Sequence, residues 1–211
     1  MTFNFATILR ESSSAHPEKP LRHGEPTFTY AQVDEISGRI ATSLRDLGVG
    51  RGDKVAVQMP NVPQCLFAYF GVLKVGAVLV PLDPLLRAPE ICHHLIICGA
   101  RLLITFESSA EEAFRGSAEI DGLRIYVAKA PIDAHLPAGT HHLDELYFAQ
   151  NTGEIEPTDA DDTALILYAN AKPKGAELTH SQLYNSYTDV GELFGFRDED
   201  MHGPRNGCVD S

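Results

Sequence analysis

Between residues 53 and 128, short apolar runs alternate with longer stretches of helical pattern, and this alternation constrains the fold more than any other feature. The runs DKVAVQMP, AVLVPLD, ARLLITF and LRIYVA are typical of strands, and the stretches between them predict helices over 62–75, 89–98 and 107–116. A continuous apolar run is typical of a parallel strand covered on both faces. Strand–helix units with a period of about 25 residues favour parallel order, because each helix carries the chain back to the start of the next strand. The predicted fold class is therefore α/β: a mostly parallel sheet flanked by helices on both faces.

The N-terminal region adds two helices and a hairpin. We expect a helix over residues 3–15 with Asn4 as its N-cap, then a hairpin in KPLRHGEPTFTY that turns at Gly24-Glu25-Pro26. Thr29 and Gln32 have the spacing of a capping box, which predicts the start of a second helix. Five apolar residues then recur at helical spacing, and Gly48 is placed to end that helix. They are Val33, Ile36, Ile40, Leu44 and Leu47.

The C-terminal half contains an acidic segment and one further strand–helix unit. From Asp144 to Asp162 the chain has seven acidic residues and no Lys or Arg, which predicts a solvated connector. TALILYA (163–169) predicts a strand, and HSQLYNSYTDVGELFGF (180–196) a helix capped by Thr179 or Ser181. The last stretch, RDEDMHGPRNGCVDS, has no periodicity and predicts an irregular tail.

Charge and composition exclude some classes of partner and location. The net charge of −12 and the pI of about 5.1 argue against a nucleic-acid partner, which usually meets a basic face. The N-terminus has no basic segment followed by an apolar one, and Lys74 interrupts the longest apolar stretch, so we expect neither a signal peptide nor a transmembrane segment. The four cysteines form no C-x-x-C pair, which favours reduced thiols in a cytoplasmic protein.

Residues 168–180, YANAKPKGAELTH, have the form of the end of a phosphate-binding loop that follows a strand. Such a loop uses glycines and hydroxyl side chains ahead of its lysine, so that backbone N–H groups can approach the phosphate closely. Here Ala169, Asn170 and Ala171 stand in those positions. The pattern therefore predicts a loop whose C-terminal part still matches a phosphate-binding loop, while the glycines and hydroxyl side chains before its lysine are missing.

Three stretches in order resemble the N-terminal part of the adenylate-forming, or AMP-binding, superfamily. They are FTYAQVDEISGRIA, LKVGAVLVPLDPLLRAPEICHHL and DDTALILYANAKPKGAELTHSQL. The segment NVPQCLFAYFGVLKVGAVLVPLDPLLRAPEI looks especially like bacterial fatty-acid–CoA ligases, which are acyl-CoA synthetases. The resemblance covers roughly residues 1–200, and its first two stretches are packing motifs in that family.

The resemblance implies a two-step ligase in its intact form, which needs ATP, Mg²⁺ and coenzyme A. Its members join a carboxylate to AMP and then pass the acyl group to a thiol. Their phosphate loop has the form [ST]-[SG]-G-[ST]-T-G-x-P-K-G. Against it this chain keeps Lys172, Pro173, Lys174 and Gly175, but has three residues between Tyr168 and Lys172 where the family has six. The resemblance therefore assigns Lys172, Lys174 and Gly175 as the remnant of an ATP phosphate loop. It implies no catalytic residue and no cofactor for this chain alone.

The rest of the family's site is expected beyond this length. Residues for adenine, ribose and Mg²⁺, and the mobile C-terminal domain with its catalytic lysine, lie further along in the family. The segment expected after FGFRDED is replaced by MHGPRNGCVDS, which suggests a frameshift, an early stop or a truncated gene model. We therefore expect an incomplete α/β domain over 1–196 and an irregular tail over 197–211.

Three functional hypotheses remain open from the sequence. The chain is a truncated synthetase that is inactive alone, an enzyme half completed by a second chain, or a non-catalytic module that binds an intact synthetase. Each allows self-association, or association with a synthetase chain, through exposed apolar surface. A metal site at His93 and His94 beside Glu90 is disfavoured, because only Glu90 and His94, four residues apart, share a helix face and no third ligand is in view. His141-His142 are expected in a solvated loop, and His180 as a helix-start residue.

Overall fold

A single seven-stranded sheet organises the chain in the computed structural model, which describes residues 2–21, 27–129, 136–137, 139–168 and 175–193. The strand order is β7-β6-β5-β3-β4-β8-β9, and every neighbouring pair is parallel except the antiparallel pair β8–β9. The mostly parallel α/β class predicted from the alternation is thus confirmed. The strands are β3 (Lys54–Gln58), β4 (Val78–Pro81), β5 (Ala100–Phe106), β6 (Arg124–Ala128), β7 (Thr140–His142), β8 (Thr163–Leu167) and β9 (Ala176–Thr179).

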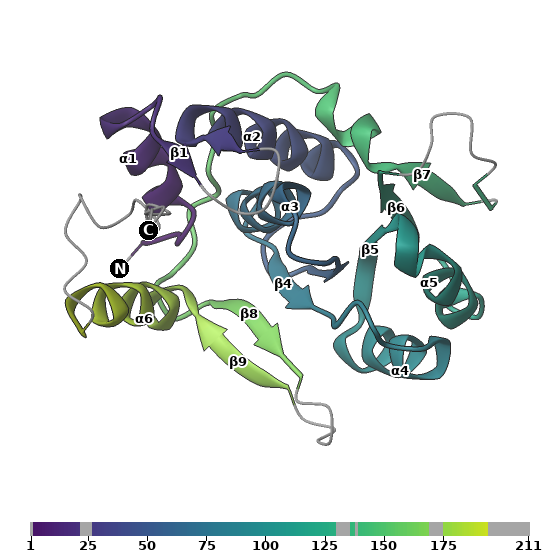
Figure 1. The fold of residues 1–211 in the computed structure, drawn as a ribbon. Coiled ribbons are helices and arrows are strands. Elements are labelled where there is room, and N and C mark those ends of the chain that lie inside the picture. Colours follow the sequence, from purple (N-terminus) through teal and green to yellow (C-terminus); the bar gives the residue numbers. More distant parts are fainter. Residues whose placement is uncertain (1, 22–26, 130–135, 138, 169–174, 194–211) are drawn as a thin grey trace, which may run out of the picture.

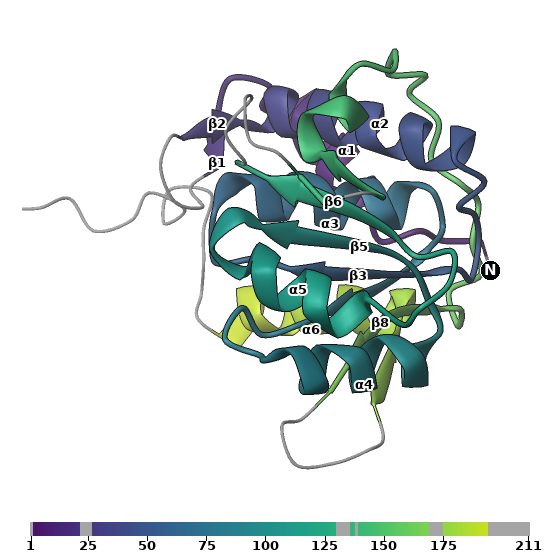
Figure 2. The same ribbon diagram turned by 90° about the vertical axis from the view of Figure 1, so that its right-hand side faces the viewer.

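Helices cover both faces of this sheet, as Figures 1 and 2 show. One face carries α1 (Thr7–Ala15), α2 (Tyr30–Asp46) and α3 (Pro63–Lys74), and the other α4 (Ala88–Cys98) and α5 (Ala110–Ser117). The 3₁₀ helix η1 (Glu107–Ser109) precedes α5, η2 (Leu143–Tyr147) follows β7, and α6 (His180–Leu193) follows β9. Along β5, Leu102 and Ile104 face the α2–α3 side while Leu103 faces the α4–α5 side, and all three are fully buried. Burial on both faces explains why the strands are apolar without alternation.

The N-terminal hairpin and the second helix form as predicted, whereas the first helix begins later than expected. β1 (Pro20–Leu21) pairs with β2 (Phe28–Thr29), and the predicted turn at residues 24–26 lies outside the described residues. At α2 the Gln32 N–H donates to the Thr29 hydroxyl at 3.2 Å, and Gln32 Oε1 accepts from the Thr29 N–H at 2.9 Å. Gly48 has a φ of 80° just past its end.

The prediction of Asn4 as a helix N-cap is wrong, because α1 begins at Thr7. The Asn4 amide instead donates to the carbonyls of Leu73 at 2.8 Å and Glu156 at 3.0 Å. Its side chain therefore fastens the N-terminal segment to the end of α3 and to the acidic connector.

A buried ion pair links the three helices of one face. Lys74, the last residue of α3, is fully buried, and its Nζ donates to Asp34 Oδ1 at 2.6 Å, to the Asp34 carbonyl at 2.7 Å and to Ser37 Oγ at 2.9 Å. Asp34 Oδ2 also accepts from Arg10 Nε at 2.8 Å. Burial lowers the pKa of Lys74, and the hydrogen bond and charge of Asp34 oppose that shift. Asp34 thus joins α1, α2 and α3 at one point.

The close contact of α2 and α3 depends on Gly71. A Cβ at this position would lie 2.5 Å from Cγ2 and 2.8 Å from Cβ of Ile40. Changing Gly71 to alanine is therefore expected to destabilise the fold by about 1–3 kcal/mol, the usual cost of overpacking a core. Urea unfolding followed by circular dichroism measures the change.

Gly50→Ala is the matched control for this prediction, because a Cβ at Gly50 meets nothing within 4 Å. It is expected to shift the free energy of unfolding by less than about 0.5 kcal/mol. If Gly71→Ala proves as stable as Gly50→Ala, the helices do not pack as closely as described.

The acidic connector is more ordered than the predicted solvated segment. It begins with η2, whose Leu146 carbonyl accepts from Ser43 Oγ at 2.9 Å, and the Glu156 N–H donates to the Lys74 carbonyl at 2.7 Å. Asn151 Nδ2 donates to a Glu35 carboxylate oxygen at 2.8 Å. Five of the seven acidic residues of the connector are nevertheless exposed and the other two are half-buried, so the prediction of a solvated segment is confirmed for them. The contacts with distant helices were not predicted, because they leave no periodic signal in the segment itself.

The C-terminal helix is confirmed as far as Leu193, and the predicted tail over 197–211 lies outside the described residues. Cys65 and Cys98 are free and buried, Cys92 is free and half-buried, and Cys208 lies outside the described ranges. Across the part of the chain that the structure describes, every helix is too short or too polar to cross a membrane.

Candidate nucleotide site at the β8–β9 hairpin

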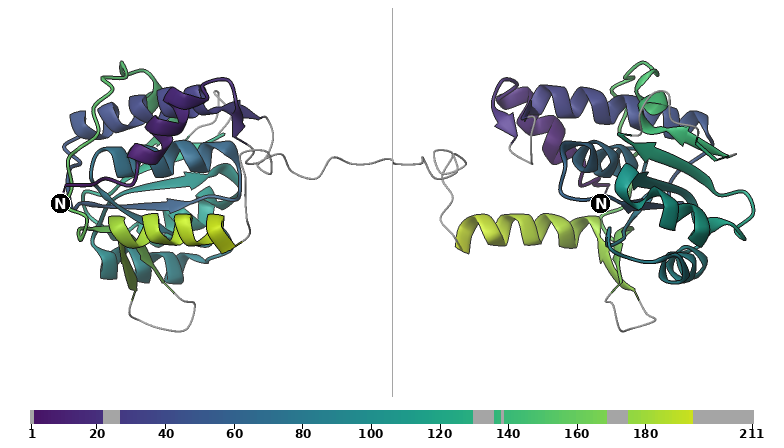
Figure 3. Two further views of the ribbon diagram at one scale, coloured as in Figure 1. Left: turned by 90° about the vertical axis from the view of Figure 1, so that its left-hand side faces the viewer. Right: turned by 45° about the vertical axis from the view of Figure 1, so that its right-hand side comes forward.

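The remnant phosphate loop joins two antiparallel strands at the edge of the sheet. β8 and β9 pair from Thr163↔Thr179 to Leu167↔Ala176, so the loop spans residues 168–175. Lys172 and Lys174 lie outside the described residues, and Gly175 is described as the residue before β9. Figure 3 shows the hairpin leaving the body of the protein below α6. The strand β9 itself is not predicted from the sequence.

Gly175 is required by packing within the hairpin. A Cβ at this position would lie 2.4 Å from Cγ2 of Ile166 and 3.0 Å from the Tyr168 ring. The Tyr168 ring in turn lies 4.9 Å from the His94 ring on α4, centroid to centroid. Burial is the main cause of the raised pKa of the Tyr168 phenol. The flanks of the loop therefore pack the hairpin against α4, a structural role that needs no nucleotide.

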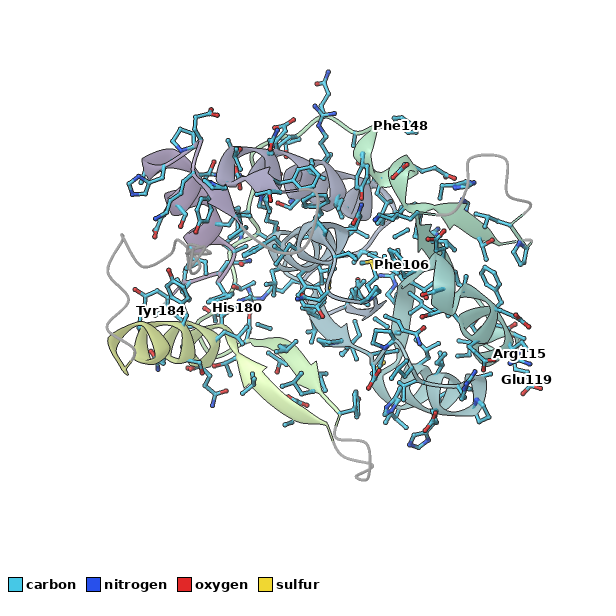
Figure 4. The ribbon with its side chains drawn as sticks, viewed as in Figure 1. Phe106, Arg115, Glu119, Phe148, His180 and Tyr184 are labelled. Carbon is cyan, nitrogen blue, oxygen red and sulfur yellow. The ribbon has the colours of Figure 1, made fainter. Side chains whose placement is uncertain are left out.

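His180 lies at the junction of β9 and α6 and joins it to the N-terminal segment. Thr179 caps α6 through a reciprocal pair with Gln182, at 3.2 Å and 2.9 Å, which confirms Thr179 as the cap. His180 is fully buried, and its Nδ1 accepts from the Phe5 N–H at 3.1 Å. Its Nε2 is buried and has no protein partner among the described residues. Figure 4 shows His180 and Tyr184 together at the start of α6.

The pKa of His180 is lowered to about 4, first because burial disfavours the charged ring. The Asp162 carboxylate raises this pKa and the Arg51 guanidinium lowers it, and these two side chains pair at 2.6 Å. A protonated ring would also place an Nδ1–H against the Phe5 N–H. His180 is thus neutral, and it begins α6, the helix-start position that the sequence predicts for it.

Two cavities lie near this junction. One of about 280 Å³ is at the amino ends of β3, β4 and β8, and its charged lining consists of Arg51, Lys54, Asp162 and Glu177. Arg51 already pairs with Asp159 and Asp162 at 2.6 Å each. The second, of about 320 Å³, lies between the N-terminal segment and α6, and its lining includes Phe3 and Tyr184. Neither cavity includes Gly175.

The histidine pairs occupy structural positions. Glu90 accepts from the Arg87 N–H at the start of α4, and the His94 ring packs between His93 and Tyr168. Among the described residues, no group of three His, Cys, Asp or Glu could hold a metal ion. The expectation of a solvated loop at residues 141–142 is wrong, because both residues lie in β7. His141 stacks on Tyr126 there, with the ring centroids 5.1 Å apart.

Known proteins resemble this chain in both sequence and fold. A family model described as "AMP-binding enzyme" matches residues 9–203. A feruloyl-CoA synthase from Amycolatopsis sp is 36% identical over 179 residues, which cover 83% of this chain and 33% of that enzyme. The benzoate CoA ligase from Burkholderia xenovorans LB400 has a TM-score of 0.76 at 27% identity and is matched over 87% of this chain and 36% of its own. The Mycobacterium tuberculosis fatty acyl CoA synthetase has a TM-score of 0.74 at 27% identity. This match covers 88% of this chain and 37% of that synthetase. The chain thus spans about a third of the length of the relatives it matches.

Proposed function

The chain belongs to the AMP-binding enzyme family, and from this premise we propose that it is the N-terminal portion of an acyl-CoA ligase that is inactive alone. Intact relatives of this kind would activate a carboxylic acid with ATP and Mg²⁺, releasing pyrophosphate, and then transfer the acyl group from AMP to the thiol of coenzyme A. The relatives' names support this class of reaction, since they include feruloyl-CoA synthase and 4-coumarate–CoA ligase. A cytoplasmic location is part of the proposal and fits the reduced cysteines.

The observation that carries the proposal is the composition of the loop between β8 and β9. Ala169, Asn170 and Ala171 offer no hydroxyl donor and no glycine for close backbone approach to phosphate. The glycine that remains, Gly175, is occupied in packing against Ile166 and Tyr168. Lys172 and Lys174 supply charge alone, and a point charge without a cradle of N–H groups orients phosphate poorly.

ATP–pyrophosphate exchange tests this proposal. The purified chain is assayed with ferulate, benzoate and fatty acids of medium and long chain, and the Amycolatopsis feruloyl-CoA synthase serves as the positive control. We expect exchange by the chain alone to equal the rate without enzyme. Exchange above that background, with any of these acids, would overturn the proposal.

A second candidate function is favoured by the open edge of the sheet. β9 ends the sheet with no further strand beside it among the described residues, and Leu167 next to it is 43% exposed. The chain would then be an enzyme half, or a regulatory module, that associates with a second polypeptide. Self-association through the same surface is the competing outcome.

A further inference from the structure

The cavity of about 320 Å³ beside α6 is bounded by three segments that lie far apart in the sequence. The N-terminal region contributes Phe3 and Glu11, the acidic connector contributes Ala160, and α6 contributes Ser181, Tyr184 and Asn185. Figures 1 and 3 show the N-terminal end of the chain close to α6. The volume falls in the range of small-ligand sites. This cavity has no part in the proposed ligase chemistry, because the remnant of the phosphate loop does not line it.

Hydrogen bonds to the acidic connector hold the walls of this cavity in place. The Phe3 N–H donates to the Thr158 carbonyl at 2.8 Å, and the Thr158 hydroxyl donates to the Phe3 carbonyl at 2.7 Å. The Ser181 N–H donates to the Ala160 carbonyl at 2.9 Å. His180 adds a further link between the N-terminal segment and α6. A ligand therefore meets a site that is already ordered, which lowers the entropic cost of binding.

Two aromatic rings form the apolar part of the cavity. The rings of Phe3 and Tyr184 lie 5.4 Å apart, centroid to centroid, at an interplanar angle of 76°. Such an edge-to-face pair leaves both faces of one ring free of the other ring. Tyr184 is 41% exposed, so its ring is accessible from solvent. The face of an aromatic ring carries negative charge density and attracts cations.

The charge around the cavity also favours a cation. Among the described residues that line it, Glu11 is the single charged side chain, and it is exposed. The neighbouring Arg10 is occupied by Asp34 at 2.8 Å and by the Gly153 carbonyl at 3.0 Å. The connector that supplies Ala160 has seven acidic residues and no Lys or Arg. An anion is therefore repelled from this part of the surface.

We propose that this cavity binds a small organic cation, with a substituted ammonium group against the rings of Phe3 and Tyr184 and close to the Glu11 carboxylate. A metal ion fits less well, because no group of three His, Cys, Asp or Glu in the described part of the chain could hold one. An ammonium group that carries alkyl substituents needs no such ligand set. Its charge interacts with the ring faces and the carboxylate, and its carbon atoms pack in the apolar part of the cavity.

Titration of the full chain with choline tests the site, and 3,3-dimethylbutan-1-ol is the control ligand. The two molecules have the same shape, but the control has a neutral carbon in place of the charged nitrogen. We expect 1:1 binding of choline with a Kd of about 1 mM or tighter, and binding of the alcohol at least about fivefold weaker. In a ¹⁵N-labelled chain, the amide signals of Ala160, Ser181 and Tyr184 should shift as choline saturates the site.

Two variants separate the contributions of the ring and the carboxylate. Tyr184→Leu keeps an apolar side chain but removes the ring, and it should weaken choline binding about 5- to 30-fold. Glu11→Gln should weaken it about two- to fivefold and reduce its dependence on salt, because the carboxylate is exposed. Tyr187→Leu is the matched control. Tyr187 lies on the same helix and is exposed, but it does not line the cavity, so this variant should bind choline as the parent does.

Three results would overturn the inference: no saturable binding of choline, equal binding of choline and the neutral alcohol, or equal affinities in Tyr184→Leu and Tyr187→Leu. Melting temperatures show whether each variant is folded. If Tyr184→Leu does not fold, Glu11→Gln decides the question, because Glu11 is exposed on α1. An affinity and a salt dependence equal to those of the parent would then count against the site.

Discussion

Replacing Asp34 with alanine is expected to lower the free energy of unfolding by about 3–5 kcal/mol, the usual cost of leaving one partner of a buried ion pair unpaired. Lys74 is fully buried, and its ammonium group would keep only the Asp34 carbonyl and the Ser37 hydroxyl as acceptors. Arg10 would lose its carboxylate partner in the same change. Urea unfolding at pH 7, followed by circular dichroism, measures the loss.

The pH dependence of the variant provides an internal check. Burial lowers the pKa of Lys74 and Asp34 opposes this, so removing Asp34 lowers the pKa further below the ordinary value of 10.5. At a pH between the folded and unfolded pKa values, the unfolded state binds more protons, so stability rises with pH. The difference in the free energy of unfolding between the parent chain and Asp34→Ala should therefore be smaller at pH 9.5 than at pH 7.

The double variant Asp34→Ala/Lys74→Met separates the loss of the pair from the loss of packing. It should recover most of the stability, because a methionine needs no partner in an apolar site. A cost below about 1 kcal/mol for Asp34→Ala alone would show that Lys74 is not held as described.

Lowering the pH from 7 towards 4 is expected to destabilise the fold by up to about 3 kcal/mol through His180 alone. Its folded pKa of about 4 lies below the ordinary value of 6.5. The stability is therefore fully present above pH 6.5 and is lost as the pH falls, because the unfolded state binds a proton that the folded state excludes. The loss at pH 5 is about 2 kcal/mol.

His180→Gln is the matched variant, because its amide oxygen can accept from the Phe5 N–H and does not titrate. Between pH 7 and pH 5 this variant should lose about 2 kcal/mol less than the parent chain. Equal losses in the two proteins would contradict the assignment of His180 as a buried neutral acceptor. Urea unfolding at matched ionic strength is the measurement.

The sequence predicts the central sheet well, because its signals are local. The strands β3, β4, β5 and β6 are buried on both faces and therefore appear as continuous apolar runs. The capping box at Thr29 and Gln32 also depends on residues three apart, so it is visible without the fold.

The parts that could not be predicted depend on contacts between distant residues. β7 and β9 are short edge strands of three and four residues, and their pairing, rather than their composition, defines them. The partner of Lys74 is on α2, 40 positions away, and the partner of His180 is 175 positions away. The lysine was visible as a break in an apolar stretch, but nothing in its surroundings indicated a buried ion pair.

For the candidate site, the sequence predicts only the residues on either side of the loop. Gly175 stands out in the sequence as part of a phosphate loop, and the structure shows why packing against Ile166 and Tyr168 requires a glycine there. The contact of Tyr168 with His94 joins two stretches that are 74 positions apart in the sequence, so no local pattern indicates it.

Isothermal titration of the purified chain with MgATP tests the central claim most directly, namely that this loop no longer holds a nucleotide. The intact feruloyl-CoA synthase from Amycolatopsis is titrated in the same buffer as the positive control. We predict no saturable heat for this chain up to about 1 mM MgATP, which corresponds to a binding free energy weaker than about −4 kcal/mol. A 1:1 isotherm with a micromolar Kd would contradict the account, because the loop would then bind phosphate without glycines or hydroxyls ahead of Lys172.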